Sequence, residues 1–357
     1  MLQKWIRKMQ FHIGMLAGIP MAAFFLSGCS STELENKSFP LAVLITEKDG
    51  QYQACYLSQQ LSEVANERAD GGNMTAESAQ GSTYYETHKT FEKNNRCRLD
   101  MSHTKALIFQ KDFMESDTLE VFLETVRQEN TYARNTLVYL SDSSMGQLAK
   151  LNDSLEVPLG SYLEQMTENE RELKEQAAVT LGALLNEQEN ADRTLLIPVI
   201  QEENGLPAVH AYEVLQNFES MGRIRTEEAQ IYYLLAGQLE QMDVQLNEKD
   251  QVRLSHLKCR RNFIMSADGV TEQVMLTAEA ERVSGRVSED EIEKEVKEKI
   301  ERACRVSRQL QGIDLSDSRK CLAMLAPEVY RVFGERAEEY VEKLNYEAKV
   351  RVKEISG

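Results

Sequence analysis

The sequence lacks the short motifs by which most enzyme families are recognised. It has no G-x-S-x-G, H-E-x-x-H, P-loop or G-x-G-x-x-G pattern, so hydrolase, zinc protease and nucleotide-binding classes find no support. Basic charge is also scarce, because 41 Lys and Arg face 58 Asp and Glu, a net charge of −17. A chain this acidic lacks the positive field that binds phosphates, so we expect no nucleic-acid partner. We also expect no enzymatic activity, catalytic residue, cofactor or metal site.

Cysteine is sparse and forms no C-x-x-C pair. Besides Cys29, the chain has five cysteines: Cys55, Cys97, Cys259, Cys304 and Cys321. An odd number without paired spacing argues against a disulfide framework and against a structural zinc site. Export would permit one disulfide, but nothing in the sequence selects which two cysteines would form it.

Long apolar runs are limited to one segment at the N-terminus. Three basic residues precede an apolar run from Ile13 to Leu26, which is the layout of a secretory signal peptide and short for a membrane-spanning helix. The next residues, Leu26-Ser27-Gly28-Cys29, resemble the bacterial lipobox. We therefore predict a signal peptide over residues 1–28, cleavage between Gly28 and Cys29, and lipid attachment to Cys29. An ordinary signal peptide followed by a chance cysteine is the alternative.

Cleavage makes the remaining chain more acidic. Loss of three basic residues leaves 38 basic against 58 acidic residues, a net charge of −20. A body of this charge is repelled by anionic headgroups, so the lipid would be its main attachment to a membrane. Two or three fatty acyl chains, at ~0.8 kcal/mol for each buried CH₂, suffice for firm anchoring.

Hydrophobic periodicity predicts alternating strands and helices in the first half of the chain. The expected strands are 39–46, 52–57, 105–109 and 136–140; the expected helices are 83–96, one capped by Ser116 and ending near Asn130, and 162–186; residues 60–82 are expected to form a surface loop. In the helix after Ser116, apolar residues recur at i, i+3, i+4 and i+7, so one face is buried. The two strands that flank it should be parallel neighbours.

The second half is predicted to be richer in hairpins. We expect strands at 194–200 and 208–215, a helix capped by Thr226 and ending at Leu239, a hairpin of 252–266 with 270–283, a helix opened by the capping box Ser288-x-x-Glu291, a shorter helix at 322–333 and a last strand at 346–352. The predicted class is α+β, with mixed, mainly antiparallel sheets flanked by helices in a multi-domain protein. An N-terminal α/β domain would cover 29–190 and a C-terminal α+β domain 191–357, with its start anywhere in 191–240.

None of the four histidines that follow the signal peptide is predicted to bind a metal. We expect His103 to make a capping or hydrogen-bonding contact before a buried strand, and His210 to be a buried core side chain. His256 and Cys259 lie three residues apart in a predicted strand. In a regular strand they would point to opposite faces and could not share a metal.

The acidic run 289–301 is the one carboxylate-rich segment that resembles a cation site. It interleaves Glu291 with Lys294 and Glu293 with Lys297 at helical spacing. Alternating charge of this kind is typical of a solvated helix face, which we prefer to cation binding.

Four segments in a shared order resemble a known family. They are Cys29 followed by an acidic residue and the strand to 46; Asp100 to Phe109 followed by a helix with Arg127 and by Arg134; Leu196 to Ile200 followed by the strand 208–215; and a charged helix followed by Gly312-Ile313-Asp314, by Ala326 to Tyr330 and by a basic last strand. Their order and spacing resemble the Ger(x)C family, the lipoprotein C subunits of bacterial spore nutrient germinant receptors. The chain departs from the family at three places. Residues 315–318 replace a glycine-containing turn, Tyr330 stands where the family often has Trp, and Tyr212-Glu213 stands where the family has Phe-Lys.

The resemblance implies a function without catalysis. It implies an α/β lipoprotein on the outer face of the spore inner membrane, assembled with integral membrane A-type and B-type receptor subunits to trigger germination. No catalytic residue transfers from the family, and Cys29 is the one site residue that does. The germinant is not specified by the sequence.

A substrate-binding lipoprotein of an ABC-type importer is the alternative reading. A lipid tether and an acidic surface suit both classes. Importer proteins are built from two lobes of repeated βαβ units and are rich in aromatic residues, whereas this chain has 7% aromatic residues and no internal repeat. The receptor subunit is therefore the preferred hypothesis.

Overall fold

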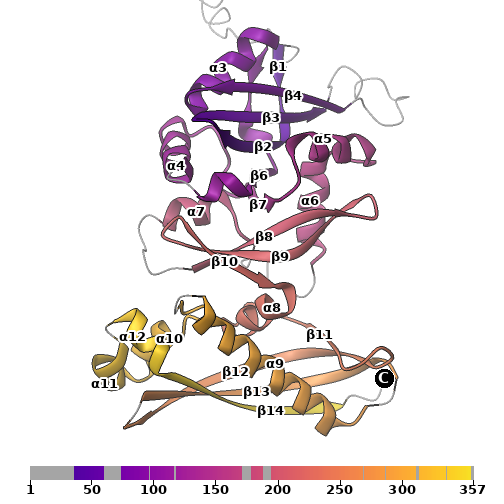
Figure 1. The fold of residues 1–357 in the computed structure, drawn as a ribbon. Coiled ribbons are helices and arrows are strands. Elements are labelled where there is room, and N and C mark those ends of the chain that lie inside the picture. The colour runs from indigo at the N-terminus through magenta and orange to yellow at the C-terminus, as the bar shows by residue number, and fades with distance from the viewer. Residues whose placement is uncertain are drawn as a thin grey trace, which may run out of the picture.

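The computed structural model describes residues 36–59, 74–95, 97–115, 118–170, 178–187, 194–267, 269–285, 287–310, 313–334 and 336–354. Two layered units are stacked end to end, each built on its own sheet (Figure 1). The short strand β1 (Lys37–Ser38) lies at one end of the molecule and the smaller sheet lies at the other (Figure 1). The predicted signal peptide, Cys29 and the Ser116 cap fall outside the described residues.

The first unit contains an eight-stranded sheet. In the order β10-β9-β8-β7-β6-β2-β3-β4, its strands are β10 (Glu219–Arg225), β9 (Leu206–Gln216), β8 (Thr194–Glu203), β7 (Leu137–Ser141), β6 (Ala106–Gln110), β2 (Pro40–Lys48), β3 (Gln51–Gln59) and β4 (Met74–Gly81). The four central strands are parallel, and antiparallel strands extend the sheet on both sides. The expected parallel pairing on either side of the helix after Ser116 is confirmed, because β6 and β7 are parallel neighbours.

Helices cover both faces of this sheet. On one face lie α3 (Tyr84–Asn95), α4 (Thr118–Glu129) and α7 (Leu181–Glu187); on the other lie α5 (Met145–Ser154) and α6 (Leu159–Glu168). Strand β2 shows why both faces need a cover, since Val43 packs into one core and Leu44 into the other, and both are fully buried. The expected apolar face of α4 is confirmed: Leu119, Phe122, Leu123 and Val126 are buried.

The second unit contains a four-stranded sheet with helices on one face. Its strands are β11 (Met242–Gln245), β12 (Gln251–Ser266), β13 (Gly269–Ser284) and β14 (Leu344–Glu354), in that order. The helices α8 (Thr226–Leu235) and α9 (Glu289–Gln309) pack on the covered face. Four short elements close the end near the β12–β13 turn: α10 (Ser318–Leu325), α11 (Pro327–Val329), the π-helical turn η5 (Tyr330–Gly334) and α12 (Ala337–Lys343).

Several predictions for the second unit are confirmed. The hairpin β12–β13 is present, and Val274, Leu276, Ala278 and Ala280 of β13 are buried at alternate positions. Helix α9 begins with the predicted capping box, in which Ser288 and Glu291 exchange hydrogen bonds. Its apolar stripe from Ile292 to Cys304 is buried against the sheet. The predicted class, α+β with mixed sheets, is therefore observed.

The two units share part of one hydrophobic core. Leu196, Val214 and Ile224 belong by hydrogen bonding to the eight-stranded sheet, yet they pack in the same cluster as α8, α9 and the smaller sheet. The three strands after residue 193 thus join the first sheet, and the smaller sheet starts at Met242. We propose that the domain boundary lies between Arg225 and Met242, a range that overlaps the end of the interval 191–240 considered from the sequence.

Two predicted segments were wrong. The helix expected over 162–186 is divided between α6 and α7, and Thr180 between them forms a strand-like bridge to Leu137. The loop expected over 60–82 includes β4, a polar edge strand in which Ala79 is the one buried residue. Both errors have one cause, since pairing with another strand, β3 for β4 and β7 for Thr180, fixed these segments against their local pattern.

Other elements escaped prediction or differ in detail. Helix α5, strand β10 and helix α12 were not expected. Thr226 is the first residue of α8 rather than its cap, and the helix ends at Leu235 rather than Leu239. The shorter helix expected at 322–333 is interrupted at Ala326, which precedes Pro327. The last strand runs parallel to β13, whereas the predicted sheets were mainly antiparallel.

Candidate functional site

The predicted lipid site, Cys29 with the cleavage position after Gly28, falls outside the described residues. Among the helices that the structure describes, none combines the length and the apolar character of a membrane span. All five described cysteines are free thiols. Burial raises the pKa of the Cys259 thiol to about 11, so this group is protonated at neutral pH.

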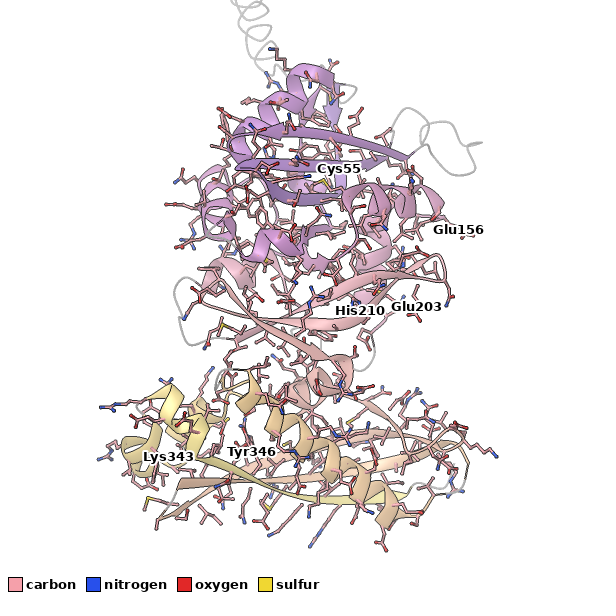
Figure 2. All side chains as sticks on the ribbon, viewed as in Figure 1. Cys55, Glu156, Glu203, His210, Lys343 and Tyr346 are labelled. Atoms are coloured by element: carbon pink, nitrogen blue, oxygen red, sulfur yellow. The ribbon has the colours of Figure 1, made fainter. Side chains whose placement is uncertain are left out.

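The histidines are scattered, and one prediction about them was wrong. His210 of β9 is exposed rather than buried (Figure 2), because β9 extends past the helices that cover the sheet centre. His256 lies at a bulge of β12, with a φ of 52° and its Nδ1 3.0 Å from Glu279 Oε2. Its ring is exposed whereas Cys259 packs against the helix-covered core, so the two side chains point to opposite faces, as expected. His103 ends a 3₁₀ turn (η2, Met101–His103) that Asp100 caps, and its ring packs against Phe39. Within the described residues no three His, Cys, Asp or Glu side chains are placed to hold a metal.

His88 is the buried histidine of the chain's described part. It lies on α3 with 8% of its surface exposed, between the rings of Tyr56 and Tyr84. Burial lowers the pKa of His88 to about 4, so the imidazole is neutral at pH 7. Its Nε2 and the Tyr56 hydroxyl have no hydrogen-bond partner. The cluster stabilises a neutral ring, and Glu129 Oε2 lies 3.8 Å from its Nδ1.

The acidic run on α9 is a solvated face that also serves the fold. Lys297 lies 3.8 Å from Glu301 and Lys299 lies 4.0 Å from Glu295, each pair one helical turn apart. Glu293 accepts a hydrogen bond from the backbone N–H of Val352 on β14, at 2.9 Å. The partners differ from the expected Glu291–Lys294 and Glu293–Lys297 pairs.

A buried ion pair ties the second sheet to the short helices beside it. Arg261 of β12 donates to Glu272 of β13, whose side chain is fully buried, and to the carbonyl oxygen of Ser316 at 2.8 Å. Burial alone would lower the pKa of Arg261, but the charge and the hydrogen bond of Glu272, together with Cys321 and Tyr346, outweigh burial and hold the guanidinium protonated. Glu272 also accepts from Ser318, which contacts the Tyr340 hydroxyl. The network is closed to solvent, so it is structural.

The eight-stranded sheet is split where the two units meet. Residues 178–180 insert between the first half of β7 and β8: Val138 N–H donates to Val179 O at 2.9 Å, and Leu181 N–H donates to Thr136 O at 2.8 Å. Strands β7 and β8 therefore pair only at their far ends, Leu140–Val199 and Ser141–Ile200. The sheet is forked, and a cavity lies on each side of the fork.

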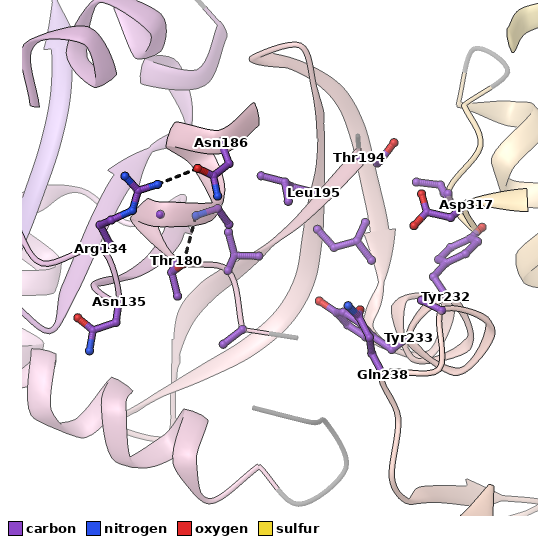
Figure 3. Close-up of a pocket in the computed structure, with 17 residues that line it drawn as sticks. Arg134, Asn135, Thr180, Asn186, Thr194, Leu195, Tyr232, Tyr233, Gln238 and Asp317 are labelled. Atoms are coloured by element: carbon purple, nitrogen blue, oxygen red, sulfur yellow. Dashed lines mark hydrogen bonds between the residues drawn. The ribbon is translucent and has the colours of Figure 1, made fainter. Parts of the chain in front are cut away.

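The larger of two cavities here, of about 540 Å³, is lined by residues of both units (Figure 3). The first unit contributes Arg134, Thr180 and Asn186, and the second contributes Tyr232, Tyr233 and Asp317. Arg134 donates to Asn186 Oδ1 at 2.7 Å, which fixes the guanidinium at the wall, and Thr180 Oγ1 accepts from Ala183 N–H at 3.2 Å (Figure 3). A second cavity of about 330 Å³ shares Ala178, Val179 and Tyr233 with the first.

This junction cavity is the candidate functional site. Its walls offer hydrogen-bonding groups and two tyrosine rings at the meeting of two units, a setting in which small-molecule sites commonly occur. Sequence reasoning missed it because its lining comes from four segments far apart in the chain. One signal was present: Arg134 had been singled out in the family-like segment, as had Arg127, which donates to Leu185 O at 2.7 Å and fixes α7.

The family-like segment from Asp100 to Phe109 makes polar contacts with several elements of the first unit. Asp100 Oδ2 accepts from Lys37 Nζ at 2.9 Å and Thr104 Oγ1 donates to Pro40 O at 3.0 Å. Lys105 Nζ donates to Glu164 Oε1 on α6, also at 2.9 Å. These contacts join the start of the chain to β6 and explain why polar residues precede a buried strand.

The chain is similar to known spore germination proteins in sequence and in fold. Residues 30–202 match the family described as the spore germination protein N-terminal domain. Among solved structures, the chain matches the crystal structure of the GerBC protein with a TM-score of 0.54 and 10% sequence identity, over 88% of this chain and 97% of that chain. At this identity the likeness shows a common fold. No curated protein sequence matches the chain.

The matched segment is a spore germination protein N-terminal domain, and the chain has the fold of GerBC. Both findings support a Ger(x)C family spore germination protein, as the order of its sequence segments predicted.

Proposed function

We propose that this protein is a non-catalytic, lipid-anchored subunit of a spore nutrient germinant receptor. It would reside on the outer face of the spore inner membrane and assemble with integral membrane A-type and B-type subunits to trigger germination. The family match over residues 30–202 carries the proposal, and the likeness in fold to GerBC extends it over both units. The proposed anchor agrees with the position of the match, which begins directly after Cys29.

The anchor is tested by the distribution of the protein between membrane and soluble fractions. We expect Cys29→Ala to release the folded protein from washed spore membranes, because the acyl chains supply most of its attachment. Cys97→Ala is the matched control, since this thiol is half-buried in the first unit and distant in sequence from the lipobox. Retention of the Cys29→Ala protein at the control level would refute the anchor.

Assembly is tested by purification of the full-length tagged protein from detergent-solubilised spore membranes. We expect A-type and B-type subunits among the co-purified proteins, and loss of nutrient-triggered release of spore small molecules when the gene is deleted. Co-purification of an ABC permease and its ATPase instead would favour the importer alternative. Normal nutrient response in the deletion strain would refute the trigger role.

A further inference from the structure

The uncovered face of the four-stranded sheet carries a cluster of basic side chains. We call this cluster the basic face; it consists of Lys258 and Arg260 on β12, Lys349 and Arg351 on β14, and Met275 and Thr277 between them on β13. All six side chains are exposed, whereas their sequence neighbours at alternate positions pack beneath α9. Side chains extend into solvent from this side of the sheet (Figure 2).

Strand register sets the geometry of the basic face. Arg260, Met275 and Lys349 are direct cross-strand neighbours, and Lys258, Thr277 and Arg351 form the next row on the same face. Strands lie ~4.8 Å apart and alternate residues ~6.8 Å apart, so the four cations stand at the corners of a rectangle of roughly 10 by 7 Å. Neither row contains an acidic residue.

These cations are not neutralised within the part of the chain that the structure describes. Lys258, Arg260 and Arg351 make no ion pair there, and Lys349 lies 3.3 Å from Glu347. Elsewhere on the same sheet arginines are paired: Arg253 donates to Asp243 at 2.8 Å, and Arg261 donates to Glu272. Local positive charge persists in a chain whose net charge is −17. Its natural complement is an anionic surface.

Apolar side chains on the basic face and beside it point to a contact rather than to solvation. Met275, at its centre, is 40% exposed, and Ile264 and Met265, further along β12, are 46% and 54% exposed. Methionine and arginine are enriched in the buried parts of protein interfaces. Protection of a sheet edge from aggregation explains basic residues on β14, which is an edge strand. It also applies to Lys258 and Arg260, because β11 pairs only with Gln251–Leu254 of β12. It does not explain the exposed Met275, because β13 is paired on both sides at this position.

The position of the basic face favours a protein over a lipid surface. It lies at the end of the molecule opposite β1 (Figure 1). Six residues separate Cys29 from Asn36, a link that spans at most about 25 Å when fully extended. If Cys29 carries the lipid, as proposed above, the β1 end is tethered within this distance of the bilayer, whereas the four-stranded sheet lies at the opposite end of the molecule (Figure 1).

We infer that the basic face is a docking surface for an acidic segment of a partner protein. An extended segment places alternate carboxylates ~6.8 Å apart, which matches the separation of the two rows. The identity of the partner as a receptor subunit rests on the proposed function. The inference that the partner segment is acidic rests only on the charges of the basic face.

The test uses the full-length, lipidated protein purified from solubilised spore membranes. The charge-reversal variant Lys258→Glu with Arg351→Glu is compared with Lys48→Glu with Arg98→Glu, an equal charge change at two exposed positions of the first unit. We expect recovery of at least one partner to fall about tenfold in the first variant and to be unchanged in the control, with equal amounts of both proteins in the membrane. Recovery with the wild-type protein should also decrease as salt is raised.

The outcomes separate this inference from the proposed function. Equal recovery of A-type and B-type subunits by wild type and by the reversal variant would overturn the docking surface and leave the receptor assignment in place. Loss of a different acidic protein would support the docking surface and contradict the receptor assignment. If the reversal instead lowers the membrane-bound share of the Cys29→Ala protein, lipid headgroups are the occupant and the inference is wrong. A wild-type protein that brings down no partner overturns both.

Discussion

The two sheets of this protein differ in how many of their faces are covered. The eight-stranded sheet has helices on both faces, and β2 accordingly presents a nearly continuous run of buried residues from Ala42 to Thr46. The four-stranded sheet has helices on one face, and β13 accordingly alternates between buried and exposed positions. At the centre of the first sheet the side chains of both faces are taken up by packing. In the second, one set of side chains remains available for contact with another molecule.

The covered face of the smaller sheet should be as intolerant of change as the larger sheet. We expect Arg261→Ala to lower the free energy of unfolding by about 3–5 kcal/mol, because it leaves the carboxylate of Glu272 buried and unpaired. Urea denaturation measures the loss. Arg253→Ala is the control, since its pair with Asp243 is solvent-exposed and should contribute under about 1 kcal/mol. Similar losses in the two variants would contradict the comparison.

The second helical layer of the larger sheet depends on a close approach. A Cβ atom added to Gly160 would lie 2.0 Å from the carbonyl oxygen of Leu41, so α6 rests directly on the backbone of β2. We expect Gly160→Ala to destabilise the protein by about 3 kcal/mol, since the helix must move away. Gly146→Ala on α5 has no atom within 4 Å of the new Cβ, and thermal unfolding should show it to be stabilised by about 0.5–1 kcal/mol. A neutral Gly160→Ala would show that this layer is loosely packed.

Burial in the larger sheet should also make stability depend on pH. Because the pKa of His88 falls from its ordinary value to about 4 in the folded state, the unfolded chain binds the proton more tightly between these values. Stability is therefore complete above the unfolded pKa and is lost as pH falls, by about 2 kcal/mol between pH 7 and pH 5. We expect His88→Phe to remove this pH-dependent loss of stability. Urea denaturation at pH 7 and at pH 5 measures the free energy of unfolding of both proteins. His210→Gln, at an exposed site, should leave the loss unchanged; an equal slope in wild type and His88→Phe would refute the assignment.

The smallest effect is expected on the uncovered face. Thr277→Val and Lys258→Thr should each change the free energy of unfolding by less than about 0.5 kcal/mol, because neither side chain is buried or paired in the described part of the chain. Leu44→Ala in the larger sheet should cost about 2–5 kcal/mol. A loss above 1 kcal/mol for either exposed variant would show that this face supports the fold and is not free for contact.

Local pattern predicted the elements that pack through their own periodicity. The stripe of α4, the alternation of β13 and the capping box at Ser288 were visible because each is set by residues within a few positions of one another. Strand β10 escaped because Gly222 and two arginines interrupt its pattern around a bulge. The bridge at Thr180 escaped because its partner, Leu137, lies 43 residues away.

The candidate site was out of reach for a similar reason. The cavity exists because residues 178–180 separate β7 from β8, an insertion that depends on backbone hydrogen bonds between distant segments. The basic face was hidden as well, since its rows join residues of β12, β13 and β14 that are 15 to 74 residues apart. Family resemblance predicted the class of protein. The position of the basic face depends on the register of the strands, which the sequence alone does not reveal.

The core shared by the two units makes them one thermodynamic body. Leu196, Val214 and Ile224 are held in the first sheet and fill the second core, so neither unit can lose its packing alone. Heat or denaturant should therefore unfold the molecule in a single cooperative transition. A fragment starting at Thr226 would expose the apolar side of α8 and aggregate, so genetic dissection at this point would separate the sequence without yielding two folded parts.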